Sequence, residues 1–156
     1  MSDFISVEPR PPEDTGIHSD PWYPDIDPEH AREALRMPDG TVTRERLREA
    51  LIEGVAYTNQ VLARWRAEQE ARGKRALDQT GEGTVDGESV QVIRYRRAVY
   101  GWAMALIIER YRGYDTSQHG MRRAEVVEMT AEESRRDAYW AVADIKGRPR
   151  FVAMLL

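Results

Sequence analysis

Cysteine is absent from the 156 residues, and no apolar stretch is long enough to span a membrane. Without cysteine the chain has no disulfides, no zinc ribbon and no thiol catalysis, and it fits a reducing compartment. The apolar run from Ala98 to Ile108 is much shorter than the roughly 20 residues that a bilayer requires. The first residues, MSDFISVEPRPPED, lack a basic start followed by an apolar run, so we expect neither a secretory signal nor a membrane anchor.

Proline is almost missing beyond residue 39, because seven of the eight prolines precede it. Proline fixes φ and removes a backbone donor, so residues 1–27 are predicted to be extended. Residues 1–40 also hold ten Asp or Glu against three Arg, a balance of −7, whereas the remainder holds 20 basic and 17 acidic residues, a balance of +3. Such an acidic arm is typical of a solvated segment or of one that meets a basic partner, and the mildly basic body is not typical of a nucleic-acid binder.

Apolar residues recur at spacings of three, four and seven in three long segments, which is the helical period. The predicted helices cover residues 43–72, 87–115 and 121–146. Thr43 is the expected N-cap of the first, and a capping box at Thr130 would divide the third into two helices. The expected core positions of the first and third helices are Leu47, Leu51, Val55, Thr58, Leu62 and Trp65, then Val127, Ala131, Ser134, Ala138, Ala141 or Val142 and Ile145.

A shorter helix is predicted over residues 28–37, because Asp27 is a good N-cap and proline follows it. The predicted fold is therefore all-α: a bundle of three to four long helices with an extended N-terminal arm and an extended apolar C-terminal tail. We expect the arm and its short helix to cover residues 1–38, the bundle residues 39–147, and the tail residues 148–156.

Glycine marks two further features of the predicted bundle. Residues 73–87 form a glycine-rich loop that we interpret as a flexible connector, since its glycines are at the wrong spacing for a phosphate-binding loop. A loop of this length between long helices often carries function. Gly54 and Gly101 lie inside predicted helices at a cost of about 1 kcal/mol each, which predicts a close crossing of helices at both positions.

No catalytic or metal-binding constellation emerges from the sequence. The three histidines fall in the predicted arm, a first helical turn and a loop, and the paired carboxylates lie on solvated helix faces. Asp25, Asp27, Glu29 and His30 could be taken as a metal site, but helix capping explains them without a metal. We therefore expect no enzyme activity, no cofactor and no metal.

One cluster of the predicted middle helix is a candidate for contact with a partner. Arg94, Arg96 and Arg97 lie beside Tyr95 and Tyr100. They could bind phosphate or the acidic groups of a partner, or they could form the ordinary polar face of a helix. The sequence leaves both interpretations open.

Apolar side chains also stand in both terminal segments. Trp22 and Tyr23 lie in the acidic, proline-rich arm, where solvated linkers rarely carry aromatic groups, so we expect them to dock on this subunit or on a neighbour. The last residues are apolar and costly to leave in water. They could add as a strand to another protein's sheet, or pack on their own bundle. The residues of this predicted docking tail are Phe151, Val152, Met154, Leu155 and Leu156.

A series of short motifs indicates a protein family, which composition alone does not. In chain order they are Asp39-Gly40-Thr41-Val42-Thr43, Arg46-Leu47, Trp65-Arg66-Ala67, Gly87-Glu88-Ser89, Tyr95-Arg96-Arg97-Ala98-Val99-Tyr100, Glu109-Arg110-Tyr111-Arg112, Tyr114-Asp115-Thr116, Arg135-Arg136-Asp137-Ala138, Trp140-Ala141, Asp144-Ile145 and Gly147-Arg148-Pro149-Arg150. The order and spacing of this series, over about residues 39–156, resemble the head completion (GpL) proteins of contractile-tailed bacteriophages.

This resemblance implies a structural protein of the virion neck, which is in the host cytoplasm during assembly. It would bind beneath the portal as a ring of about twelve subunits and close the filled capsid. Its partners would be further copies of itself, the portal protein, and a tail terminator or other neck protein. DNA would pass through the channel without sequence-specific binding, because acidic groups repel phosphate, and no membrane would be involved.

The resemblance also implies roles for particular segments. The tail from Phe151 to Leu156 would dock on the portal, the acidic arm would wrap a neighbouring subunit, and the loop 73–87 would face the channel or the next neck ring. The residues expected between subunits are Trp22, Tyr23, Arg94, Arg96, Arg97 and Tyr100. The alternative is a small helical DNA-packaging or regulatory protein that grips DNA with Arg94, Arg96 and Arg97.

Overall fold

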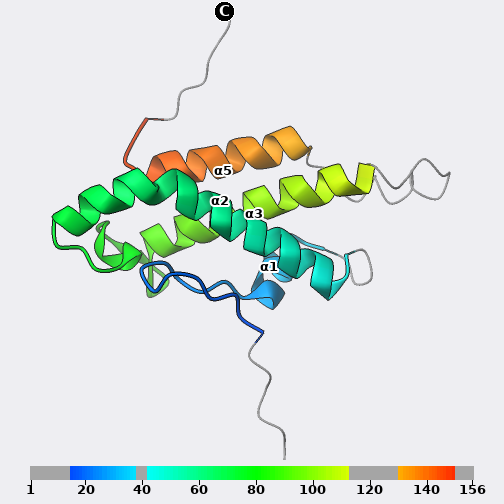
Figure 1. The fold of residues 1–156 in the computed structure, drawn as a ribbon, viewed down its shortest axis with the longest axis horizontal. Helices are drawn as coiled ribbons and strands as arrows, with labels where there is room; N and C mark the ends of the chain where they lie inside the picture. Colours follow the sequence, from blue (N-terminus) through cyan, green and yellow to red (C-terminus); the bar gives the residue numbers. More distant parts are fainter. Residues whose placement is uncertain (1–14, 38–41, 113–129, 150–156) are drawn as a thin grey trace, which may run out of the picture.

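The computed structural model describes residues 15–37, 42–112 and 130–149, which form four α-helices and a small hairpin (Figure 1). The all-α prediction is confirmed. The first 14 residues, residues 121–129 of the third predicted helix, and the tail 150–156 lie outside the described residues. The elements are α1 (Pro28–Ala34), α2 (Arg44–Ala71), a 3₁₀ turn η1 (Leu77–Gln79), β1 (Thr84–Val85), β2 (Glu88–Ser89), α3 (Val90–Arg112) and α5 (Ala131–Ile145).

Helix α2 begins at the predicted place. The hydroxyl of Thr43 accepts a hydrogen bond from the backbone N–H of Arg46, which satisfies one of the free donors of the first turn. The predicted core stripe from Leu47 to Leu62 is buried, and Trp65 is half-buried against the same core. The face that the stripe defines is the one that packs on α3.

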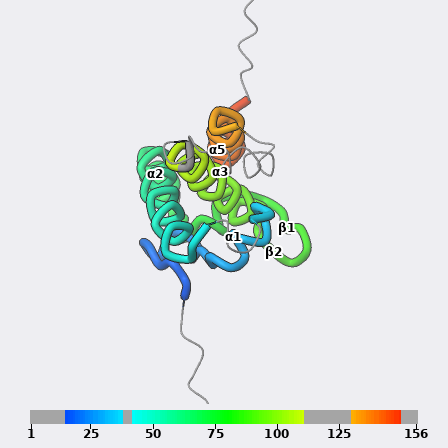
Figure 2. The backbone as a smooth tube through the Cα atoms, turned by 90° about the vertical axis from the view of Figure 1, so that its right-hand side faces the viewer, coloured from blue at the N-terminus to red at the C-terminus, as the bar shows by residue number. Residues whose placement is uncertain are grey.

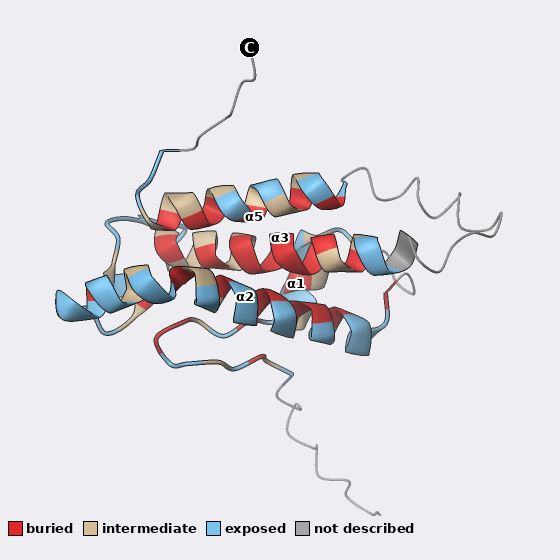
Figure 3. Ribbon diagram, turned by 45° about the horizontal axis from the view of Figure 1, so that its top comes forward, coloured by how far each residue is buried: buried red, intermediate tan, exposed pale blue. Residues whose placement is uncertain are grey.

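Helix α3 is the middle layer of the molecule, with α2 on one side and α5 on the other (Figure 2). Most of α3 is buried, whereas the outer faces of α2 and α5 are exposed (Figure 3). No helix in the described part of the chain is long and apolar enough to cross a membrane. The long apolar run of α3 is therefore covered by its two neighbouring helices.

Two glycines allow the three helices to approach closely, as the sequence predicted. A Cβ added at Gly54 of α2 would lie 2.6 Å from the carbonyl oxygen of Val99 on α3. A Cβ added at Gly101 of α3 would lie 2.8 Å from the carbonyl oxygen of Ser134 and 2.9 Å from the Cβ of Ala138, both on α5. These separations are shorter than carbon and oxygen atoms tolerate, so only glycine fits at either crossing.

The predicted caps of α5 and α1 are also present. The side chain of Thr130 accepts from the backbone N–H of Glu133, and the Glu133 carboxylate accepts from the backbone N–H of Thr130, which completes a capping box. The carboxylate of Asp27 accepts from the backbone N–H of Glu29 and starts α1. Helix α1 ends at Ala34, earlier than residue 37.

The connection between α2 and α3 is more ordered than a flexible connector, and our interpretation of it was wrong. Leu77 is buried, and its backbone N–H donates to the carbonyl of Trp22 at 2.9 Å. Strands β1 and β2 then form an antiparallel hairpin through Asp86 and Gly87, which both have positive φ. Such a two-residue turn favours Asp-Gly. Because Glu88 and Ser89 belong to β2, helix α3 starts later than residue 87.

Residues 15–27 contain no helix, turn at residues 21–23, and contribute side chains to the core. Ile17 and Ile26 pair through two backbone hydrogen bonds of 2.8 and 3.0 Å, which closes this segment into a loop. Both side chains are buried together with Trp22 and Tyr23. The segment therefore lies across α2 and α3 as part of one apolar cluster with them.

Replacing Gly101 by alanine should destabilise the protein, although alanine favours a helix over glycine by about 1 kcal/mol. The new methyl would force α3 away from α5, and we expect the free energy of unfolding in urea to fall by about 1–3 kcal/mol. The reverse change Ala63→Gly, at an exposed position of α2, is the control and should cost only about 1 kcal/mol of helix propensity. A Gly101→Ala protein as stable as the unmodified one would contradict the close crossing.

Candidate functional site

The arginines of α3 bind carboxylates of their own chain. Arg96 forms an ion pair with Glu88 of β2. Arg97 forms an ion pair with Asp137 of α5, in which Nε lies 3.0 Å from Oδ2, and its guanidinium is 3.7 Å from Asp144. The two arginines therefore tie α3 to the hairpin and to α5.

Arg94 is also used inside the bundle. Its Nη1 donates to the side chain of Gln91 at 3.2 Å and to the backbone carbonyl of Asp144 at 3.4 Å. Gln91 is itself buried and donates to the carbonyl of Ile145 at 3.1 Å. These contacts close the C-terminal end of α5 against α3. The three arginines thus act as links between elements, and they do not gather into an open basic patch.

The two tyrosines beside these arginines are buried. Tyr95 donates its hydroxyl proton to the side chain of Asn59 on α2 at 2.7 Å, and burial raises the pKa of its phenol. The Tyr100 hydroxyl lies 2.7 Å from Nδ1 of His30, and burial raises the pKa of Tyr100 to about 12. Each phenol joins α3 to another element.

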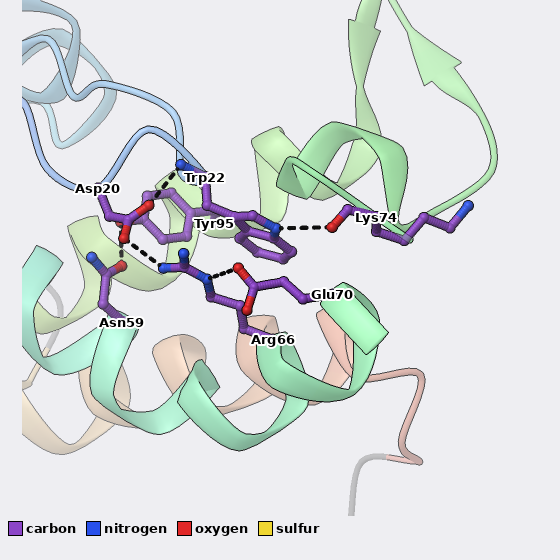
Figure 4. A network of polar contacts seen from close by, with 7 residues as sticks. All are labelled: Asp20, Trp22, Asn59, Arg66, Glu70, Lys74 and Tyr95. Carbon is purple, nitrogen blue, oxygen red and sulfur yellow. Dashed lines mark hydrogen bonds and ion pairs between the residues drawn. The ribbon is translucent and has the colours of Figure 1, made fainter. Parts of the chain in front are cut away.

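Trp22 lies beside Arg66 of α2 (Figure 4), and Tyr23 contacts the same guanidinium. The guanidinium carbon of Arg66 lies 5.2 and 5.3 Å from their ring centroids, within the range of cation–π attraction. Arg66 also pairs with Asp20 at 2.9 Å and with Glu70 at 3.0 Å. The hydrogen bond from Arg66, with a second from the backbone N–H of Trp22, holds the pKa of Asp20 below its ordinary value.

Trp22 and Tyr23 are almost fully covered by their own chain. Trp22 and Tyr23 expose 4% and 5% of their surface. Tyr23 stacks on Tyr95 with centroids 5.1 Å apart. Both residues pack on their own chain, which was the alternative to an inter-subunit contact. Because so little of either side chain is accessible, we propose no contact with a neighbouring subunit through them.

The outer face of α5 carries a groove that the sequence reasoning did not identify. Its volume is about 590 Å³, and Arg135, Arg136, Tyr139, Trp140 and Arg148 contribute to its lining. The guanidinium of Arg136 lies 5.1 Å from the centroid of Trp140, one helical turn away. A signal was available in the sequence, because Arg135-Arg136 and Tyr139-Trp140 are four residues apart and so share one helix face.

The residues once considered for a metal have other partners. His18 lies 3.1 Å from Asp25, Asp27 caps α1, and Glu29 lies 3.6 Å from Arg44. In the part of the chain that the structure describes, no group of three or more acidic or histidine residues could hold a metal ion.

Comparison with known proteins assigns the chain to a family. The sequence pattern of the family described as "Phage head completion protein (GPL)" matches residues 17–156. The chain belongs to this phage head completion family. It is also similar to the head completion/stabilization protein of Escherichia phage P2, with 41% identity over 147 residues that make up 94% of this chain and 86% of that protein. No solved structure matches.

Family membership fixes the class of function. This head completion protein is a structural protein of the phage head and virion, and it is not an enzyme. Its partners are proteins of the capsid or neck. The motifs that gave the resemblance fall mostly on residues that hold the bundle together, among them Arg66, Tyr95, Arg96, Arg97 and Asp137.

Trp22→Ala should destabilise the isolated head completion protein by about 3–5 kcal/mol, because it leaves a cavity between α2 and the N-terminal segment. Urea denaturation of the purified chain measures this loss. Val85→Ala, which truncates an apolar side chain that is 59% exposed, is the control and should change stability by less than about 0.5 kcal/mol. Unchanged stability of Trp22→Ala would show that Trp22 does not pack on its own chain in solution.

Proposed function

We propose that this protein forms a ring of about twelve copies beneath the portal, where it seals the DNA-filled capsid and provides the platform for tail attachment. Family membership over residues 17–156 is the observation that carries the proposal. The layered bundle supports it, because the described chain begins beside α2 and ends beyond α5, on opposite faces (Figure 1). A subunit of this kind can offer different faces to different neighbours.

The proposed contact with the portal is the apolar tail, Phe151, Val152, Met154, Leu155 and Leu156. The described chain leaves α5 through Gly147, Arg148 and Pro149, which are exposed. Helix α5 therefore ends before the apolar residues begin, which supports a docking role for the tail. Addition of an extended segment to a partner's sheet edge gives affinity through backbone hydrogen bonds and specificity through alternate side chains.

DNA passage through the ring is proposed to occur without a grip on the duplex. Arg96 and Arg97 are neutralised by Glu88, Asp137 and Asp144, so phosphate would have to displace carboxylates that are already in place. A near-neutral to acidic wall lets DNA slide, because it offers no array of cations for counterion release. This pairing counts against the alternative, in which these arginines clamp DNA.

Replacing Leu155 and Leu156 by aspartate should abolish binding to the portal, since two charges would have to be buried in an apolar contact. Co-sedimentation with assembled portal measures the loss, and circular dichroism should show an unchanged bundle. Val85→Asp places one such charge on the exposed hairpin and is the control, with normal binding expected. Normal portal binding by the doubly substituted tail would refute its docking role.

Duplex DNA should bind weakly to the purified protein at physiological salt. A clamp built from three arginine–phosphate contacts would give a slope of log K against log salt of about −2.7. Fluorescence anisotropy over a salt series measures this slope, and we expect a value near zero that Arg96→Gln does not change. Tight binding with the steep slope, reduced to about −1.8 by Arg96→Gln, would favour the DNA-binding alternative.

A further inference from the structure

The groove on the outer face of α5 has a positive lining with free cations. Arg136 and Arg148 are exposed, and within the described residues neither has a carboxylate at ion-pair distance. Arg135 pairs with Glu109, and Glu132 is the acidic residue of the lining. With Glu109 counted, three guanidinium groups against two carboxylates leave the groove with a net charge of +1.

The groove also offers aromatic surface beside these cations. The guanidinium of Arg136 stacks over the ring of Trp140. The neighbouring Tyr139 is 53% exposed. The ring of Tyr139 also packs edge-on against Trp102 of α3, with the two centroids 5.1 Å apart. Aromatic residues and arginine on one exposed face are the composition of protein-binding hot spots. The groove therefore suits a segment that is both acidic and apolar.

Residues 1–14 of this chain have that composition. They contain Asp3, Glu8, Glu13 and Asp14 against one arginine, and they include the apolar residues Phe4, Ile5 and Val7. The apolar tail 150–156 carries no acidic side chain, so it matches the groove less well. Charge complementarity therefore favours the N-terminal segment as the occupant.

The position of residue 15 indicates whose groove the segment can reach. The carbonyl of Thr15 accepts from Arg48 of α2 at 2.6 Å, so the N-terminal segment leaves from the α2 face. Figures 1 and 2 both show the start of the described chain, at residue 15, and α5 on opposite sides of the bundle. Fourteen extended residues span at most about 50 Å. The path to the chain's own groove goes round three helix layers, together about 30 Å thick, and would use more than half of that reach, whereas the groove of an adjacent copy can face the α2 side directly.

We propose that the groove formed by Arg135, Arg136, Tyr139, Trp140 and Arg148 binds the acidic N-terminal segment, residues 1–14, of a second copy of the chain. The α2 face of one copy then lies toward the α5 face of the next. Two different faces meet in such a contact, and heterologous contacts of this kind close into rings. The inference rests on the proposed ring and names the contact that links its subunits.

Photo-cross-linking in assembled heads tests this contact. Phe4 is replaced by the photoreactive residue p-benzoylphenylalanine in the full chain, and the heads are irradiated and separated by denaturing electrophoresis. We expect covalent dimers of this protein, and mass spectrometry should place the cross-link on the peptide that contains Trp140. Cross-links within one chain, cross-links to another phage protein, or dimers joined at a different face would each overturn the proposal.

Charge reversal tests the chemistry of the same contact. Arg136→Glu with Arg148→Glu should lower the dimer yield about tenfold, and Glu13→Arg with Asp14→Arg in that background should restore it. Arg72→Glu with Arg75→Glu, two exposed arginines at the far end of α2, is the matched control and should leave the yield unchanged. An unchanged yield in the groove variant would also overturn the proposal.

The copy number of the protein in the same heads separates this inference from the proposed function. A full ring whose Phe4 cross-links lie elsewhere would refute the groove contact and leave the ring intact. Absence of the protein from the neck, or a single copy there, would refute the ring and the groove contact together.

Discussion

Close contact of α3 with its two neighbours is the constraint on which this structure depends. Gly54 lets α2 approach the backbone of α3 near Val99, and Gly101 lets α3 approach α5 near Ser134. The apolar run of α3 is long, and it stays out of water only because both neighbours lie against it. Tight helix packing of this kind resists shear between the three layers.

Polar contacts link the helices to one another, to the hairpin and to the N-terminal segment. Arg97 reaches α5, Arg96 reaches β2, and Arg66 on α2 holds the N-terminal segment through Asp20 and the ring of Trp22. Each pair joins elements that are far apart in sequence, so each contributes to the register of one layer on the next. On the outer face of α5, Arg136 and Arg148 are exposed, and within the described residues neither has a carboxylate at ion-pair distance.

Local sequence signals were enough to predict much of this fold. Contacts between residues far apart in the sequence could not be predicted in this way. The caps at Thr43 and Thr130 and the glycine crossings depend on nearby residues and on helical spacing, so the sequence alone revealed them. The pairing of Arg97 with a carboxylate 40 residues away, and the burial of Trp22, depend on how the helices pack, and spacing along one helix cannot show this. The hairpin at Asp86 was readable from its Asp-Gly turn but was overlooked.

The groove on α5 was missed for a similar reason, since its arginines were visible on one helix face while its partner segment lies at the other end of the chain. An electron cryo-microscopy map of the head–tail junction tests the central claim most directly. The account predicts a closed ring beneath the portal in which every subunit has α3 enclosed between α2 and α5. A junction without this protein, or with one copy of it, would contradict the account.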